Sequence, residues 1–343
     1  MTESYHDDTP DYMSPIQMSA VSDSPSTARD VAAVVIGRNE GPRLEACLHA
    51  LIRVLPRVVY VDSGSTDGSV AFAQVLGVDV VALDMSVPFT AARARNVGLA
   101  ALAEDAPKFV QFLDGDCVLQ DGWLPCALAA MAAEPDLGVV AGRRREIRPD
   151  RSIYNRLCDH EWDTPVGEAR AVGGDMLARY GAIAGVGGFR PDLIAGEEPE
   201  LCLRLRADGW RIRRLDCEMT RHDANMTRFA QWWSRTRRAG HAFAEGSWLH
   251  GRAPERHWTA ETRRALLWGA VIPAVAVLGG LLVHPLCLLL LLAYPAQFLR
   301  LRPRMGAARA LFMLLGKFPE ALGALGFYRN LLMRRRNTLI EYK

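Results

Sequence analysis

No charged side chain occurs from Ala265 through Leu299, a run of 35 residues. As one α-helix this run would be about 52 Å long, well beyond the hydrocarbon core of a membrane, which is about 30 Å thick. His284 and Pro285 lie near its middle, and proline disfavours the continuation of a helix. The run therefore predicts a hairpin over 265–299 with two apolar helical arms of about 15 to 18 residues, near the lower limit for a full span.

The charges that flank this run indicate its orientation. Arg263 and Arg264 precede it, and three arginines follow it at positions 300, 302 and 304. Because arginine and lysine are enriched on the cytoplasmic side of membrane segments, we expect both ends of the hairpin in the cytoplasm. A full span and a re-entrant hairpin both fit this pattern, and a buried helical pair in a soluble protein is a third interpretation.

Residues about 310–333 combine apolar side chains with a few charges and end in three arginines at 334–336. This composition predicts an interfacial amphipathic helix whose basic end faces anionic lipid. A soluble surface helix packed on the rest of the protein is the alternative. Together with the hairpin, it predicts a helical membrane-associated region over residues 251–343.

The composition of the remaining chain bounds its class. Residues 1–29 are rich in Ser, Thr, Asp and Pro, which predicts a disordered tail. A formal net charge of only +2 gives no electrostatic case for a nucleic-acid partner. Seven scattered cysteines without a Cys-x-x-Cys pair fit reduced thiols in a cytosolic compartment. The acidic N-terminus lacks the apolar core of a secretory signal, so we expect the part of the chain outside the hairpin to lie in the cytoplasm.

Short apolar strands alternate with helices in residues 30–250. The pattern predicts strands at 31–36, 58–61, 78–83 and 109–113, with helices at 43–54, 69–76 and 92–102. This order is typical of an α/β domain with a mostly parallel sheet and helices on both faces. Ligands of such sheets bind outside the carboxyl ends of the strands. The polar residues predicted at these ends are Asn39, Glu40, Asp62, Asp114 and Asp116.

Two carboxylates follow the fourth predicted strand directly, in Asp114-Gly115-Asp116. Carboxylate oxygens suit a divalent cation such as Mg²⁺ or Mn²⁺, which can bridge to a diphosphate. The sequence therefore predicts a metal-assisted diphosphate site at this edge of the sheet.

Four segments resemble, in order, the signatures of family-2 glycosyltransferases of the A-type fold. They are Val34-Val35-Ile36 with Arg38-Asn39-Glu40, Val61-Asp62-Ser63-Gly64-Ser65-Thr66-Asp67, Asp114-Gly115-Asp116, and Gly187-Gly188-Phe189 with Gly196-Glu197-Glu198 through Gly209-Trp210. The likeness covers about residues 31–225. It implies an inverting, nucleotide-sugar-dependent enzyme of a membrane-associated bacterial type, with its catalytic domain over residues 30–250.

The resemblance also implies roles for individual residues. Those expected near the nucleotide are Asn39, Glu40, Asp62, Ser63, Gly64, Arg93, Arg95, Asn96 and Asp114. Gly174 and Asp175 are expected beside the donor sugar, while Asp116 and His222 are expected to ligate the metal. Glu198 matches the position of the catalytic base, and its neighbour Glu197 stays a candidate because the family usually has Glu-Asp at these two positions.

Taken together, these features predict transfer of a sugar to a glycan or lipid-linked acceptor at the cytoplasmic face of the cell inner membrane, in polysaccharide or cell-envelope glycan synthesis. Gln231-Trp232-Trp233-Ser234-Arg235 departs from the Gln-x-x-Arg-Trp of processive synthases, which favours single addition. A nucleotidyltransferase and an inactive membrane scaffold are the alternatives, although the Gly-rich phosphate loop of the former is missing before residue 42. No Gly-x-Gly-x-x-Gly follows the first strand, which argues against a dinucleotide-dependent oxidoreductase.

Overall fold

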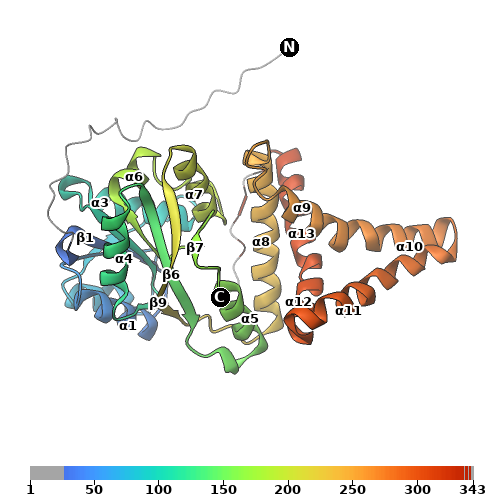
Figure 1. The fold of residues 1–343 in the computed structure, drawn as a ribbon, viewed down its shortest axis with the longest axis horizontal. Coiled ribbons are helices and arrows are strands. Elements are labelled where there is room, and N and C mark those ends of the chain that lie inside the picture. The colour runs from blue at the N-terminus through green and yellow to red at the C-terminus, as the bar shows by residue number, and fades with distance from the viewer. Residues whose placement is uncertain (1–26, 336, 339, 341–343) are drawn as a thin grey trace, which may run out of the picture.

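The computed structural model describes residues 27–335, 337, 338 and 340. Residues 1–26 of the expected tail therefore lie outside the described residues. Thr27 caps a single 3₁₀ turn, Ala28–Asp30, that leads into the first strand. From there the chain forms an α/β half followed by a helical half (Figure 1).

The α/β half is built on one mixed sheet. Its strands are β1 (Val31–Gly37), β2 (Arg57–Asp62), β3 (Asp79–Ala82), β4 (Phe109–Asp114), β5 (Cys117–Leu119), β6 (Leu137–Glu146), β7 (Gly167–Glu168), β8 (Met176–Arg179) and β9 (Arg211–His222). Their order is β3-β2-β1-β4-β8-β6-β9-β5, with β7 paired to β9. The first four strands of this order are parallel, and β8 runs antiparallel to both of its neighbours.

Helices cover both faces of this sheet (Figure 1). They are α1 (Pro42–Ile52), α2 (Ser69–Val75), α3 (Ala91–Ala101), α4 (Trp123–Ala133), α5 (Ile153–Trp162), α6 (Tyr180–Gly185) and α7 (Glu197–Ala207). Strand β1 is apolar throughout because its side chains alternate between two cores. Val31, Ala33 and Val35 join α1 and α4 in one core, whereas Ala32 and Val34 join α3 and α7 in the other. The predicted α/β fold with a mostly parallel sheet is confirmed.

The helical half starts with α8 (Phe229–His250), which stands beside the sheet domain (Figure 1). It continues through α9 (Thr259–Leu266), a π-helical turn (Leu267–Val271), α10 (Ile272–Leu282), the 3₁₀ helix η5 (Pro285–Leu292), α11 (Ala293–Met305), α12 (Ala307–Leu315) and α13 (Lys317–Leu332). The single helix expected at about 310–333 is thus divided at Gly316 into α12 and α13.

Helix α13 packs closely against α8, and glycines make the close approach possible. A Cβ atom at Gly240 would lie 2.0 Å from the Glu320 carbonyl oxygen, and one at Gly323 would lie 2.0 Å from the Arg237 carbonyl oxygen. The backbones of α8 and α13 therefore lie in direct contact, so that α13 packs on α8.

Three helical segments are long and apolar enough to cross a membrane by length and composition, among the described residues: Thr259–Leu282, Pro285–Met305 and Ala307–Leu332. The first two form a hairpin that projects away from the rest of the protein (Figure 1). Its leucines are largely exposed, with Leu282 at 80%. The chain reverses at Val283–Pro285, where the central proline of the sequence predicts a turn.

One expectation about the cysteines is wrong. Cys126 on α4 and Cys217 on β9 form a disulfide, although 91 residues separate them. Sequence spacing does not reveal this pair because α4 and β9 meet only in the folded protein. The cysteines at 47, 117, 158, 202 and 287 are free thiols.

Candidate active site

The parallel register brings polar residues together at the carboxyl ends of β1, β2 and β4. Ile36 on β1 is paired with Asp114 on β4, and Gly37 is paired with Asp62 on β2. The three strand ends therefore form one edge, as expected for parallel strands.

Asp62 holds the loop that follows β2. One of its carboxylate oxygens accepts hydrogen bonds from the backbone N–H groups of Gly64 and Ser65, both at 2.9 Å, and the other accepts from the Tyr60 hydroxyl at 2.9 Å. Ser63 is buried beside it and donates its N–H to the Gly37 carbonyl at 3.0 Å. Gly64 has a φ of 83°, a backbone conformation that favours glycine. Asp62 thus shapes the expected nucleotide loop.

Asn39 closes the same loop from the end of β1. Its side-chain oxygen accepts from the Thr66 N–H at 2.7 Å, and its own N–H donates to the Ser65 hydroxyl at 2.9 Å. Glu40 is buried and forms an ion pair with Arg43 at 2.7 Å. Asn39 therefore supports the shape of the loop, whereas Glu40 is held by α1.

The three polar residues at the start of α3 lie in different environments. Arg93 donates to the carbonyl oxygens of Asp84, Val87 and Pro88, all at 2.9 Å. The Asn96 amide bonds the backbone of Phe189 in both directions, at 2.6 and 2.8 Å, and so ties the Gly187-Gly188-Phe189 segment to α3. Both side chains brace loops around the site.

Arg95 lies inside the site and contacts three carboxylates. Its guanidinium is 2.9 Å from Asp114, 3.0 Å from Glu197 and 3.0 Å from Glu198. Burial alone would lower the pKa of Arg95, but the charges of Glu198, Asp114 and Glu197 hold it above its ordinary value. Arg95, expected near the nucleotide, joins the end of β4 to the start of α7.

Glu197 and Glu198 open α7 after Gly196, whose φ is 84°. Glu197 is buried, whereas Glu198 is partly exposed toward the site. Burial, followed by the charge of Glu197, raises the pKa of Glu198 to about 7, although Arg95 opposes the shift. A carboxylate with this pKa can accept a proton from a hydroxyl near neutral pH, so the geometry favours Glu198 over Glu197 as a general base.

Gly174 and Asp175 lie against this cluster. A Cβ atom at Gly174 would be 2.1 Å from an Arg95 nitrogen and 2.9 Å from a Glu198 oxygen, so only glycine leaves room for both side chains. Asp175 is buried, accepts from the Asp114 N–H at 3.2 Å and accepts from the Thr220 hydroxyl at 2.8 Å.

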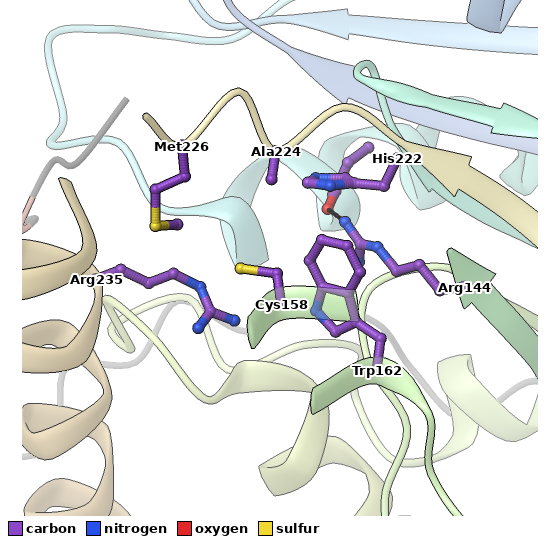
Figure 2. A pocket seen from close by; sticks show the side chains of 8 residues that line it. Arg144, Cys158, Trp162, His222, Ala224, Met226 and Arg235 are labelled. Carbon is purple, nitrogen blue, oxygen red and sulfur yellow. Dashed lines mark ion pairs between the residues drawn. The ribbon is translucent and has the colours of Figure 1, made fainter. Parts of the chain in front are cut away.

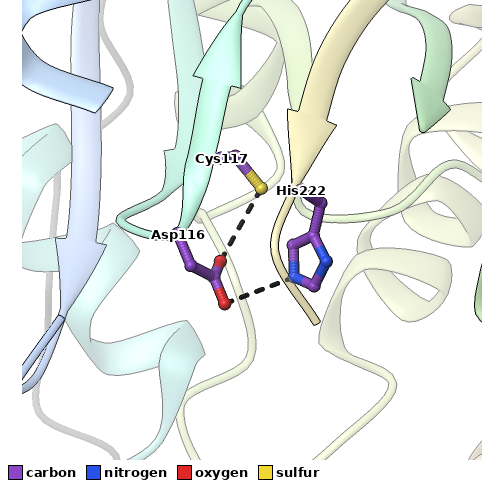
Figure 3. A group of neighbouring side chains, drawn as sticks. All are labelled: Asp116, Cys117 and His222. Atoms are coloured by element: carbon purple, nitrogen blue, oxygen red, sulfur yellow. Dashed lines mark hydrogen bonds and ion pairs between the residues drawn. The ribbon is translucent and has the colours of Figure 1, made fainter. Parts of the chain in front are cut away.

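Asp116 and His222 face each other on the other side of Asp114. The antiparallel pairing of β5 with β9 sets Cys117 opposite His222, which brings His222 Nε2 within 3.3 Å of an Asp116 oxygen. The Cys117 thiol lies 3.7 Å from the other Asp116 oxygen (Figure 3). The ligand atoms of these three buried residues are all within 4.8 Å of one another. A carboxylate oxygen and an imidazole nitrogen fit a divalent cation that also binds ligand oxygens.

Sequence reasoning did not identify several residues that shape this side of the site. Glu146 at the end of β6 is buried, with one oxygen 3.8 Å from His222 Nδ1. Arg144 lies 3.4 Å from Asp175 and 3.5 Å from Asp114. Its place in the run Arg143-Arg144-Arg145 gave no signal, because a basic run is usually a solvated surface.

A cavity of about 140 Å³ opens beside the Asp116–His222 pair (Figure 2). Arg144 and Trp162 both line it, with the Arg144 guanidinium 4.8 Å from the centre of the Trp162 ring. The same ring meets His222 at 4.6 Å. Arg235 reaches the opposite wall from α8 and is held by Glu161 at 2.8 Å. The cavity therefore joins the candidate metal ligands to α8.

Comparison with known proteins identifies the class to which this fold and site belong. Residues 32–185 match the model of the family described as Glycosyl transferase family 2. Residues 32–185 therefore belong to a family-2 glycosyltransferase domain with the A-type fold.

Among curated proteins, the chain is similar to the pre-mycofactocin glycosyltransferases of two Mycobacterium tuberculosis strains, CDC 1551 / Oshkosh and ATCC 25618 / H37Rv. Each is 30% identical over 220 residues, which cover 60% of this chain and 45% of that protein. The chain therefore matches less than half the length of these curated relatives.

Among solved structures, the chain is similar to the mannosyltransferase PcManGT from Pyrobaculum calidifontis in complex with GDP-Man and Mn²⁺. The TM-score is 0.60 at 20% identity, covering 89% of each chain. It is also similar to GalNAc-T7 with UDP, GalNAc and Mn²⁺, with a TM-score of 0.51 at 13% identity, covering 73% of this chain and 52% of that chain. At these identities the likeness shows the shared fold.

Proposed function

We propose that this glycosyltransferase moves one sugar from a nucleotide-sugar donor to an acceptor hydroxyl with inversion, assisted by a divalent cation, at the cytoplasmic face of a membrane. The observation that carries the proposal is the arrangement around Asp114. Glu198 with its raised pKa lies on one side, joined to Asp114 through Arg95. Asp116 and His222 lie on the other.

Each residue has a role in this proposal. Asp116 and His222 would hold the cation, which neutralises the charge of the departing nucleoside diphosphate when it is bound. Glu198 accepts the proton of the attacking hydroxyl. Arg95 fixes the Glu198 carboxylate, and the Asp62 loop receives the nucleotide. One displacement from the face opposite the leaving group inverts the anomeric configuration.

The membrane part of the proposal rests on the hairpin and its charges. Apolar side chains cover the exposed surface of α10 and η5, and arginines lie at both ends of the apolar run. This distribution suits a hairpin in lipid whose two ends stay on the same side. The acceptor would then be a lipid-linked compound or a glycan at the membrane surface.

A donor panel tests the proposed activity. Purified protein is incubated with UDP-, GDP- and dTDP-sugars, with and without Mn²⁺, and its melting temperature is recorded. A true donor should stabilise the folded protein more when the cation is present. Transfer is then assayed on lipid phosphates, soluble glycans and pre-mycofactocin, the compound in the names of the mycobacterial relatives. No stabilisation by any nucleotide sugar and no transfer would refute the proposal.

A further inference from the structure

We infer that the tip of the hairpin ends inside the hydrocarbon of the bilayer, so that the protein inserts from one side without crossing the membrane. This inference rests on the proposed membrane anchoring and adds how deeply the hairpin enters the bilayer. The partner that the hairpin surface fits is the acyl chains of lipid.

The length of the arms carries the first step. Trp268 and Tyr294 lie at the base of the hairpin, with ring centres 5.6 Å apart, and the Tyr294 hydroxyl donates to the Trp268 carbonyl. Such aromatic pairs are typical of the membrane–water interface. At about 1.5 Å per residue, the arm from Trp268 to Val283 is about 24 Å long. Even from Ala265 the arm is about 28 Å, at the lower limit for crossing a hydrocarbon core of about 30 Å.

The backbone of the turn carries the second step. Val283 and His284 both donate their N–H groups to the Gly279 carbonyl at 2.9 Å, and Cys287 donates to the His284 carbonyl at 3.0 Å. Leu286 donates to the Nδ1 atom of the His284 ring at 3.2 Å, and Pro285 has no N–H. These N–H groups are thus satisfied within the protein, which removes the donor part of the cost of placing the turn in hydrocarbon.

The side chains of the tip carry the third step. Leu281, Leu282 and Val283 are 76%, 80% and 82% exposed, and Leu286 is 64% exposed. No charged residue lies between Ala265 and Leu299 to reach the far headgroups. A turn that emerged into water would expose these apolar side chains at a free-energy cost. The tip therefore fits hydrocarbon better than the opposite aqueous face.

Close packing makes the hairpin a preformed unit. A Cβ atom at Gly279 would lie 3.0 Å from the Cys287 side chain, and one at Gly280 would lie 3.0 Å from Leu288. The two glycines bring α10 and η5 into contact near the tip. The two arms of the hairpin thus pack directly against each other.

The native Cys287 thiol tests the depth of the tip. The other free cysteines are buried, so a membrane-impermeant maleimide should report on Cys287, and C287S confirms the assignment. Full-length protein is labelled in intact spheroplasts and in inverted vesicles, with and without detergent. We expect labelling below about a tenth of the detergent value from either side. The variant R256C, near the start of α9, should react in inverted vesicles alone.

Any other labelling result contradicts a specific part of the inference. Labelling of Cys287 in intact spheroplasts would show that the tip crosses the membrane. Labelling in inverted vesicles would place the hairpin outside the bilayer. A full-length chain that is soluble without detergent would refute the anchor itself, and failure of the donor panel would bear on the proposed transfer alone.

A charge at the tip gives an independent measurement. L286K should reduce the membrane-bound fraction at least threefold, because an ammonium group in hydrocarbon is unfavourable. V75K is the matched control, since Val75 on α2 is 85% exposed in the sheet domain. Equal membrane binding of L286K and V75K would contradict a buried tip.

Discussion

The Arg95 guanidinium lies 3.0 Å from a carboxylate oxygen of Glu198, although more than one hundred residues separate them in the chain. The same guanidinium contacts Asp114 at 2.9 Å. One buried cation thus links the end of β4, where the donor is expected, with the start of α7, which carries the candidate base. The predictions below follow from this link and from the residues around it.

Replacing Gly174 by alanine should disturb the link directly. The added Cβ would lie 2.1 Å from an Arg95 nitrogen and 2.9 Å from a Glu198 oxygen. Because a displacement of about 1 Å at reacting groups can lower a rate about 100-fold, we expect a 10- to 100-fold loss of kcat. Gly173→Ala is the matched control, because a Cβ there meets nothing within 4 Å. Equal kcat values for the two variants would contradict the role of Arg95.

The rate of transfer should depend on pH through Glu198. Burial and the charge of Glu197 raise its pKa to about 7, and only the carboxylate form accepts a proton. The value of kcat/KM should therefore fall about tenfold per pH unit below about 7 and level off above it. A profile that is flat from pH 5 to 8 would exclude Glu198 as the titrating base.

Arg95→Lys should shift that profile. Lysine keeps one positive charge but cannot form the three contacts of the guanidinium, so Glu198 loses part of the interaction that opposes its raised pKa. We expect the midpoint of the acidic limb to move to higher pH. A purely structural role of Arg95 would lower the melting temperature and leave the midpoint unchanged.

Asp116→Asn should remove the effect of Mn²⁺. Loss of one ligand charge weakens the cation site, so we expect transfer to fall at least 100-fold and the Mn²⁺-dependent part of the donor-induced thermal shift to disappear. Asp121→Asn is the control, because Asp121 lies nearby in an exposed pair with Arg53. Near-normal activity of D116N at saturating Mn²⁺ would contradict the metal assignment.

Much of this site could be predicted from local sequence patterns. The apolar strand β4 followed by Asp114-Gly115-Asp116, and the strand β2 ending at Asp62, are short-range signals, and parallel strands bring such ends together. The bend at Pro285 was equally visible, because proline and a gap in charge are local features.

Other parts depend on contacts between distant segments. The carboxylate partners of Arg95 come from α7 and β4. From sequence, the position of Arg95 near the start of a helix indicated only a contact with the nucleotide. Glu146 faces His222 because β6 and β9 pair with irregular register, which no residue pattern showed. The Cys126–Cys217 bond and the close packing of α8 on α13 have the same origin. The spacing of residues in the sequence does not predict these long-range contacts.

The measurement that tests the proposed mechanism most directly compares Glu198→Gln with the native enzyme in two assays on the same preparation. Donor affinity with Mn²⁺ is measured by calorimetry, and transfer is measured at saturating donor and acceptor. An amide keeps the shape of the side chain but cannot accept a proton, so we expect affinity within about threefold and a loss of kcat of about 100-fold or more. Glu197→Gln, at the buried neighbour, should lose less. Transfer by E198Q within threefold of the native rate would contradict the assignment of Glu198 as the base.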